Sequence, residues 1–325
     1  MRTVLVTGAS GYLGSHVVRL LHAGGYRPRA LVRTTSDLAG LRGLDPDLRY
    51  GDLLDTASLE AAASGCDTVF HCAVDTRALL RDPAPLFACN VRGLTNAMDA
   101  AVRAHVHRFV LAGSIATVGR PRSRPATEED AFDWAGAPAY VRSRVAGERR
   151  LLGYCRERGL GGVSMCVGTT FGPGDTQPTP QGALLRRAAT GRLRFALSAT
   201  MPCVDVRDAA EAMVLAAERG RPGRRYIVVA DQVAHERLFA LAAGASGRRP
   251  PRPVPVRWAM AAARVVASAA RLGGHHVDLR PEAVELACGF GPYDNSRART
   301  ELGWTPRPIE DTVRDAVAWF RRHRP

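Results

Sequence analysis

The sequence predicts an α/β protein built on a doubly wound parallel sheet, on two observations. An apolar strand at 3–7 leads through a glycine-rich turn into an amphipathic helix at 12–23. Apolar runs typical of buried strands then alternate with helical patterns through the first half of the chain, which indicates parallel strands joined by helices on both faces of the sheet. The expected strands are 3–7, 28–33, 48–51, 68–72, 108–113, 162–167 and 225–229, and the expected helices are 12–23, 36–42, 56–64, 85–104, 138–158 and about 206–218.

The turn after the first strand has the glycine spacing of a dinucleotide-binding loop. The first glycine permits the tight turn, the second lets the backbone approach a pyrophosphate, and the third lets the helix pack closely on the sheet. The free N–H groups and the positive dipole end of the helix favour an anion at this point. We therefore expect a Rossmann-type domain whose loop, with glycines at 8, 11 and 14, contacts the dinucleotide through Gly8, Ser10, Gly11, Tyr12 and Leu13.

The residue that ends the second strand indicates which dinucleotide is bound. An acidic side chain there would accept a hydrogen bond from the 2′-hydroxyl of NAD, but this chain has Arg33, whose guanidinium can pair with a 2′-phosphate. The sequence favours NADP, with NAD as the alternative if Arg33 is simply a solvated arginine. Asp52 and Leu53 follow the third strand and are expected beside the adenine, although Asp52 could equally cap the next helix.

Composition excludes several classes of protein. The 325 residues carry a formal net charge of +14, and every basic side chain is arginine because no lysine occurs. The arginines are scattered and no DNA-binding motif is visible, so we expect anionic small ligands and no nucleic-acid partner. The seven cysteines lack the spacing of a zinc site or a disulfide framework, so we predict no metal and a cytoplasmic location. The chain starts directly with a strand, which indicates no signal peptide.

The longest apolar stretch, Trp258 to Leu272, is interrupted by Arg264 and Arg271. It is too short and too charged to span a bilayer, so no integral membrane segment is expected. We expect it to contribute to the core of a second lobe. A place at a membrane surface or against a lipophilic substrate is the alternative.

Several further motifs carry a family resemblance: Gly51-Asp52-Leu53, Ser114, Tyr140-Val-Arg-Ser-Arg144, Gly172-Pro173-Gly174-Asp175, Asp205-Val206 and Glu301-Leu302-Gly303-Trp304. With the glycine loop they cover nearly the whole chain. Together they resemble the extended short-chain dehydrogenase/reductase family, also described as the NAD-dependent epimerase/dehydratase superfamily. Within it, the chain is most similar to the dihydroflavonol-reductase and 3β-hydroxysteroid-dehydrogenase-like branch.

The resemblance implies three catalytic positions. Tyr140 would be the acid/base, Ser114 would orient a carbonyl, and the residue one helical turn after the tyrosine would hold the nicotinamide ribose. It also implies cofactor contacts at the ends of the fourth and sixth strands, from Cys72, Ala73, Val74, Val167, Thr169 and Thr170 as well as Tyr140 and Arg144. The family has lysine where this chain has Arg144. Arginine keeps the positive charge but is bulkier, planar and always protonated.

Two interpretations of Arg144 remain open. In the first, arginine does the work of lysine in an active oxidoreductase, and the replacement reflects the absence of lysine from the whole chain. In the second, strict oxidoreductase chemistry is lost or repurposed, which leaves a non-catalytic dinucleotide-binding protein or a non-redox catalyst. A nucleotide-sugar epimerase, which oxidises and re-reduces its substrate without net redox change, is a further alternative on the same scaffold.

The expected organisation has two lobes. Residues 1–166 with 203–231 form the dinucleotide-binding domain, and residues 167–202 with 232–325 form a smaller, mostly helical substrate lobe. We predict an NADP-dependent oxidoreductase that interconverts a ketone or aldehyde and an alcohol on a small, fairly apolar metabolite. Asp75, Thr117 and Gln177 are candidate substrate contacts. The family also implies a homodimer packed through helices near 85–104 and 138–158.

Overall fold

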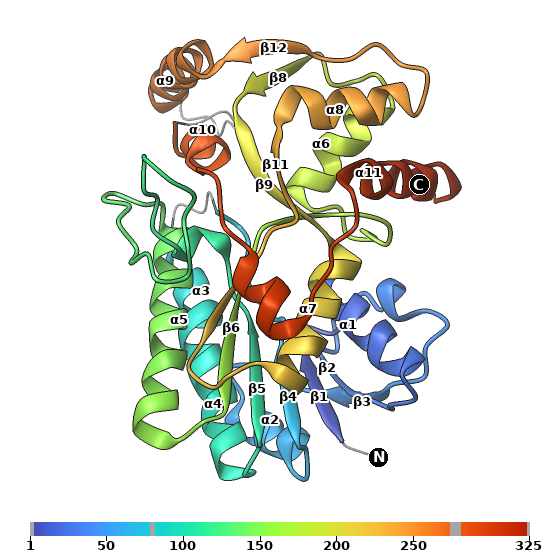
Figure 1. Ribbon diagram of the computed structural model, residues 1–325, viewed down its shortest axis with the longest axis vertical. Coiled ribbons are helices and arrows are strands. Elements are labelled where there is room, and N and C mark those ends of the chain that lie inside the picture. Colours follow the sequence, from blue (N-terminus) through green and yellow to red (C-terminus); the bar gives the residue numbers. More distant parts are fainter. Residues whose placement is uncertain (1–2, 79–81, 274–280, 324–325) are drawn as a thin grey trace.

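The computed structural model describes residues 3–78, 82–273 and 281–323, and for 268–273 it describes the backbone alone. Its centre is a seven-stranded parallel sheet in the order β10-β6-β5-β4-β1-β2-β3 (Figure 1). The strands are β1 Val4–Thr7, β2 Arg29–Val32, β3 Asp47–Tyr50, β4 Thr68–His71, β5 Arg108–Ala112, β6 Gly162–Val167 and β10 Arg225–Val228. Strand order reverses between β1 and β4, which places a crevice at their carboxyl ends, where ligands bind in this architecture.

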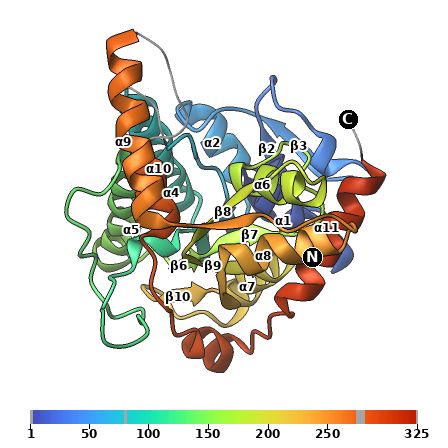
Figure 2. The same cartoon turned by 90° about the horizontal axis from the view of Figure 1, so that it is seen from above.

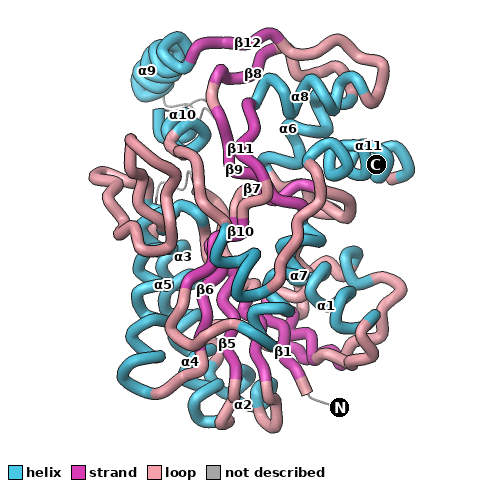
Figure 3. Tube along the Cα trace, viewed as in Figure 1, coloured by secondary structure: helices cyan, strands magenta, loops and turns pink. Residues whose placement is uncertain are grey.

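Helices cover both faces of the sheet, as the alternating sequence pattern predicts (Figures 1 and 3). Val6 and its neighbour Leu5 are both buried, but they belong to cores on opposite sides, because successive strand side chains point to opposite faces. The first core contains α1 (Tyr12–Ala23) and α7 (Val206–Arg219). The second contains α2 (Thr56–Ala63), α4 (Leu94–Arg103) and α5 (Ala139–Arg158). This confirms the doubly wound fold.

Two expected helices differ from the structure. The segment 85–104 is helical but has three parts: α3 (Ala84–Phe87), a π-helical stretch η2 (Ala88–Gly93) and α4. The predicted helix 36–42 is wrong, because only a single 3₁₀ turn, η1 (Ala39–Leu41), forms there. Ser36 accepts a hydrogen bond from the Arg33 N–H and Asp37 accepts one from the Ala39 N–H, so these side chains stabilise turns instead of a helix.

The smaller lobe lies above the carboxyl edge of the sheet, as Figure 3 shows. Its helices are α6 (Pro180–Ala189), α8 (His235–Gly244), α9 (Val256–Gly273), α10 (Pro281–Cys288) and α11 (Ile309–Arg322). Strands absent from the sequence prediction add two small sheets: β7 (Thr169–Phe171), β9 (Thr200–Asp205) and β11 (Asp231–Ala234) form one, and β8 (Phe195–Ser198) and β12 (Arg252–Pro255) form the other. The chain passes between the sheet and the smaller lobe near 167–169, 203–206 and 229–231. It then returns to the first core at η4 (Ala298–Leu302), where Ala298, Leu302 and Trp304 pack.

Candidate functional site

The glycine loop has the backbone geometry that a phosphate cradle requires. Gly8 has a φ of +65°, and a Cβ added to it would lie 2.6 Å from the backbone of Ala73. A Cβ on Gly14 would lie 2.1 Å from the Gly8 carbonyl oxygen. The loop is closed by a hydrogen bond of 3.0 Å from the Gly11 N–H to that same oxygen. Only glycine fits at positions 8 and 14, so α1 can start directly against the sheet.

The N-terminus of α1 fits a pyrophosphate. Gly11 is its N-cap, no described side chain caps the helix, and its first turn contains no acidic residue. The free N–H groups and the positive end of the helix dipole are therefore available to an anion. Ser10 directly precedes the N-cap, and Leu13 packs against the first core. Tyr12 instead turns its ring toward the edge of His16, at a centroid distance of 5.7 Å, and burial raises the pKa of its phenol well above its usual value.

Arg33 and Asp52, the two polar residues expected beside the adenosine, differ in whether their side chains are free to bind a ligand. Arg33 is exposed directly after β2, and the hydrogen bonds that it makes to described residues join its backbone to Ser36. The carboxylate of Asp52 accepts a hydrogen bond of 2.8 Å from the Leu54 N–H, so it stabilises its own turn. Asp55 caps α2 through the N–H groups of residues 57 and 58. Leu53 packs on the core beside α4, with its carbonyl bonded to Asn96.

The loop after β4 forms the floor of the crevice. Cys72 is buried against Met213, and burial raises the pKa of its thiol to about 12, so this cysteine packs as an unreactive apolar residue. Ala73 lies against Gly8, and Val74 is exposed. Asp75 pairs with Arg77 at 2.6 Å, and hydrogen bonds from that guanidinium lower the pKa of the carboxyl.

Asn90 in the π-helical stretch connects this loop to the helix that carries Tyr140. Its side chain accepts from the Asp75 N–H at 2.8 Å and donates to the Asp75 carbonyl and to the Ser143 hydroxyl, both at 3.0 Å. Ser143 in turn donates to the Tyr140 carbonyl at 2.7 Å. Asn90 therefore holds the loop after β4 and the start of α5 together.

Tyr140 lies in the first turn of α5 and is half-buried. It packs with a cluster that comes from three separate segments: Ala116, Phe132, Trp134, Ala137, Val141, Val145, Leu286 and Phe290. Ala116 belongs to the 3₁₀ turn η3 (Ile115–Thr117), whose N-cap is Ser114. The fold thus brings the predicted phenol beside the turn that carries the predicted serine. The aromatic surroundings of Tyr140 were not predicted, because Trp134 and Phe290 lie in loops without a recognisable motif.

Arg144 lies one turn further along α5 and is buried, with 8% of its surface exposed. One of its terminal nitrogens donates to the carbonyl of Ala112 at the end of β5, while its Nε has no hydrogen-bond partner within the described chain. Below it, His71 shares a hydrogen bond of 3.0 Å with Thr7. Burial, with the nearby charge of Arg144, lowers the pKa of His71 to about 3, so this imidazole is neutral. Arg144 brings a fixed positive charge to the crevice.

An unpartnered buried N–H at this point fits a ligand that brings oxygen atoms, such as the hydroxyl groups of a ribose. The uncapped N-terminus of α1 and the closely packed glycines fit the pyrophosphate of the same ligand. The residues present therefore suit a dinucleotide across the β1–β4 switch point.

The other predicted contact residues lie in three different parts of the structure. Val167 ends β6, and Thr169 and Thr170 in β7 pair with β9, so all three lie where the chain first enters the smaller lobe. Thr117 is 2% exposed and donates to the Ser114 carbonyl at 2.8 Å, which places it behind the serine turn. The only hydrogen bond described for the Gln177 side chain reaches the Asp37 carbonyl after β2, on the side where Arg33 lies.

A buried ion pair behind the serine turn escaped the sequence analysis. Glu148 and Arg225 approach to 3.2 Å, and their side chains are 6% and 13% exposed. Glu148 accepts a hydrogen bond from Ser164, and Arg225 donates to the Thr117 carbonyl at 3.0 Å. Glu148 follows Tyr140 and Arg144 at four-residue spacing on one face of α5. This four-residue spacing is the feature of the sequence that could have identified Glu148 as part of the same helix face.

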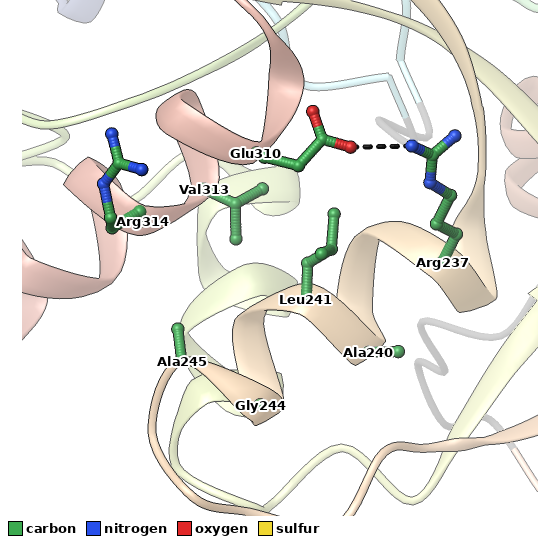
Figure 4. A pocket seen from close by; sticks show the side chains of 8 residues that line it. All are labelled: Arg237, Ala240, Leu241, Gly244, Ala245, Glu310, Val313 and Arg314. Atoms are coloured by element: carbon green, nitrogen blue, oxygen red, sulfur yellow. Dashed lines mark hydrogen bonds and ion pairs between the residues drawn. The ribbon is translucent and has the colours of Figure 1, made fainter.

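A second hollow, of about 670 Å³, lies between α8 and α11 (Figure 4). Leu241 and Val313 form its apolar floor, and Arg237 pairs with Glu310 at 2.6 Å across one side. None of the residues that line it belongs to the predicted site. Among the described residues, no group of three histidine, cysteine or acidic side chains could hold a metal ion.

Comparison with known proteins places this geometry in a family. The chain is 31% identical over 98% of its length to "Sterol demethylase protein B" of Methylococcus capsulatus, and covers 98% of that protein. It is 29% identical to a "Putative dihydroflavonol 4-reductase" of Synechocystis, covering 98% of this chain and 94% of that one. The solved structure of gox2253 superposes with a TM-score of 0.89 at 33% identity, covering 100% of this chain and 99% of that chain.

The sequence model of the NAD dependent epimerase/dehydratase family matches residues 4–229, which is the sheet with its crevice. The match includes the glycine loop, Ser114, Tyr140 and Arg144. The expected resemblance is confirmed, and with it the enzyme class: the relatives are NAD(P)-dependent oxidoreductases and epimerases of the extended short-chain type. This chain belongs to the NAD dependent epimerase/dehydratase family.

Proposed function

We propose that this protein is an NADP-dependent carbonyl reductase, or the reverse alcohol dehydrogenase, acting on a lipophilic metabolite. The observation that carries the proposal is the placement of Tyr140. Its phenol belongs to an aromatic cluster, adjoins the turn of Ser114 and lies one helical turn from the buried Arg144.

Each residue then has a defined task. A nicotinamide cofactor, when bound, would supply or accept the hydride. The Ser114 hydroxyl orients the carbonyl oxygen, and Tyr140 gives that oxygen a proton on reduction or takes it back on oxidation. Arg144, one helical turn further along α5, holds the ribose through the donors of its guanidinium. Orientation of both reactants in one crevice lowers the barrier further.

The substrate class follows from the surroundings of Tyr140. Phe132, Trp134 and Phe290 present apolar surface, and Arg120 stacks over the Trp134 ring at 4.2 Å. Such walls favour a hydrophobic or aromatic ketone over a nucleotide sugar, whose diphosphate needs convergent cations. The relative named for sterol demethylation is consistent with a lipophilic substrate.

NADP is the proposed cofactor because of Arg33. It is exposed at the end of β2, where an NAD-binding protein of this fold carries an acidic residue. Its guanidinium is not paired with a carboxylate among the described residues, so it can bind a 2′-phosphate. We also propose a cytoplasmic location. The family-based homodimer through α4 and α5 stays a prediction.

The test is oxidation of NADPH by the purified protein with a panel of aryl, alicyclic and steroidal ketones. We expect net consumption of NADPH, slower consumption of NADH, and a loss of roughly 100-fold or more in kcat for Tyr140→Phe. The control Tyr26→Phe, in the periphery of the Rossmann domain, should be unchanged. A product isomerised without net NADPH consumption would replace the reductase by an epimerase, and full activity of Tyr140→Phe would end both.

A further inference from the structure

One end of the smaller lobe is made from two segments without a single acidic residue. Residues 176–204 contain no Asp or Glu, and neither do residues 237–277. These segments supply α6, β8, α8, β12 and α9. They contribute exposed arginines from different elements, at positions 192, 194, 248, 249, 252, 257 and 264. The net positive charge of the chain is therefore concentrated at this end.

The same end exposes large apolar side chains. Phe195 in β8 is 59% exposed, Trp258 in α9 is 62% exposed and Val265 in α9 is 69% exposed. Phe195 is paired with Arg252 across the two-stranded sheet, so the aromatic ring and the guanidinium share one face. Figure 1 shows β8, β12 and α9 together at the top of the molecule, the end opposite the N-terminus.

Helix α9 has an inner and an outer face. Ala263 is fully buried and Met260 is half-buried, so this side packs toward the lobe and α10. Trp258, Ala261, Ala262 and Val265 are exposed, at the spacing of one helical stripe. Arg257 and Arg264, seven residues apart, are exposed beside that stripe. Figure 2 shows that α9 lies at one side of the molecule and projects beyond the neighbouring elements.

We propose that this face, formed by Phe195, Arg252, Arg257, Trp258, Arg264 and Val265, binds the surface of an anionic phospholipid bilayer. The helix would lie flat, with Trp258 and Val265 at the boundary between headgroups and acyl chains and the arginines on lipid phosphates. Each basic residue near an anionic surface strengthens binding. The proposed face itself contains no carboxylate, and the exposed Glu282 and Glu285 belong to α10, which packs on α9. In the described chain, no helix is long and apolar enough to cross a membrane, so the contact is peripheral.

A nucleic acid would also attract the arginines, but it would leave the apolar stripe without a favourable partner. A bilayer interface accommodates both the charge and the apolar surface. The face is also connected to the site: α10, which packs on α9, brings Leu286 to the cluster around Tyr140. A lipophilic substrate dissolved in the bilayer would meet the enzyme at the lobe that borders its crevice.

The test is sedimentation of the full-length protein with vesicles. We expect binding to vesicles of phosphatidylcholine with 30% phosphatidylglycerol, little binding to phosphatidylcholine alone, and weakening at high salt. Because each basic residue adds about fivefold to partitioning, the double variant Arg257→Glu/Arg264→Glu should bind at least about 25-fold more weakly. The matched control Arg149→Glu/Arg156→Glu reverses two exposed arginines of α5 at the same seven-residue spacing and should bind like the parent.

Tryptophan fluorescence gives a second readout that does not depend on charge. Of the four tryptophans, Trp258 is 62% exposed, Trp134 and Trp304 are buried, and Trp319 is half-buried in α11, outside the proposed face. Vesicle binding should therefore shift the emission to the blue, and Trp258→Phe should remove the shift. The proposal is overturned if the two charge-reversal variants bind vesicles equally, if the emission is unchanged by anionic vesicles, or if duplex DNA of equal phosphate concentration produces the same blue shift as the vesicles.

Discussion

Arg144 is the residue at which this chain departs most clearly from its family. Its guanidinium is buried at the carboxyl edge of the sheet and donates to the Ala112 carbonyl, so its position is fixed before any ligand binds. A guanidinium offers several donors in one plane, whereas an ammonium is a compact point charge. One bond to Ala112 therefore leaves other donors, including the unpartnered Nε, for the ribose.

Substitution of Arg144 distinguishes a charge effect from a packing effect. Arg144→Met keeps most of the volume but removes the charge, so we expect kcat to fall by roughly 100-fold and cofactor affinity to fall with it. Arg144→Lys should retain most of the activity, because the charge remains. The exposed Arg142, two residues earlier on the same helix, provides the control Arg142→Met, which should behave like the parent.

Stopped-flow or steady-state kinetics with a cofactor titration would measure both effects. If Arg144→Met has the kcat and the cofactor affinity of the parent, Arg144 takes no part in the mechanism.

The sequence predicts the motif residues of the site but not the side chains that surround them. The positions of Ser114, Tyr140 and Arg144 follow from spacing, because a strand end and one helix face are regular. The aromatic cluster could not be foreseen, because Trp134 and Phe290 are far apart in sequence and meet only through the packing of two loops. Thr117 was expected to face substrate, yet hydrogen bonds to the Ser114 carbonyl and from Arg225 hold it in the interior.

At the scale of elements, the glycine loop and α1 act as one unit. Gly14 begins the close contact between α1 and the strand that precedes it, and its missing side chain sets the distance. A methyl group there meets backbone atoms of Gly8 and Ala9, which cannot move aside as a flexible side chain could. The helix would have to shift, and the phosphate cradle would shift with it.

We therefore expect Gly14→Ala to weaken NADPH binding by at least tenfold and to lower the free energy of unfolding by about 1–3 kcal/mol through overpacking. Isothermal titration and urea unfolding would measure the two quantities. Gly153→Ala is a matched control, because Gly153 also lies inside a helix but a Cβ there meets only the flexible end of Glu157, at 3.6 Å. That variant should bind normally and be slightly stabilised by alanine's helix propensity. Normal affinity in Gly14→Ala would contradict the cradle.

The elements of the central sheet were predictable because buried parallel strands give continuous apolar runs. The strands of the smaller lobe were not. Phe195–Ser198 and Arg252–Pro255 are short and partly exposed, and two prolines stand in the second one, so no apolar run marks them. The false helix at 36–42 arose from periodicity alone, where Ser36 and Asp37 favour turns through their own hydrogen bonds.

At the scale of the whole molecule, two buried histidines of the cofactor domain make the free energy of unfolding depend on pH. His16 in α1 is bonded at 3.0 Å to the Pro173 carbonyl of the smaller lobe, and burial lowers its pKa to about 4. His71 in β4 has a pKa lowered to about 3. Both are neutral in the folded protein at pH 5, whereas an unfolded histidine titrates near pH 6.5.

The sign of the pH effect follows from this difference. Between pH 6.5 and about 4 the unfolded chain binds protons that the folded protein does not, so acidification favours unfolding. Each histidine should lower the free energy of unfolding by roughly 2 kcal/mol between pH 7 and pH 5. Urea unfolding at the two pH values would measure the loss in the parent and in His16→Gln and His71→Gln. Each variant should lose about 2 kcal/mol less than the parent over the same interval, while the exposed His22→Gln should lose as much as the parent. An equal loss in all four proteins would mean that groups other than His16 and His71 set the acid limit of this fold.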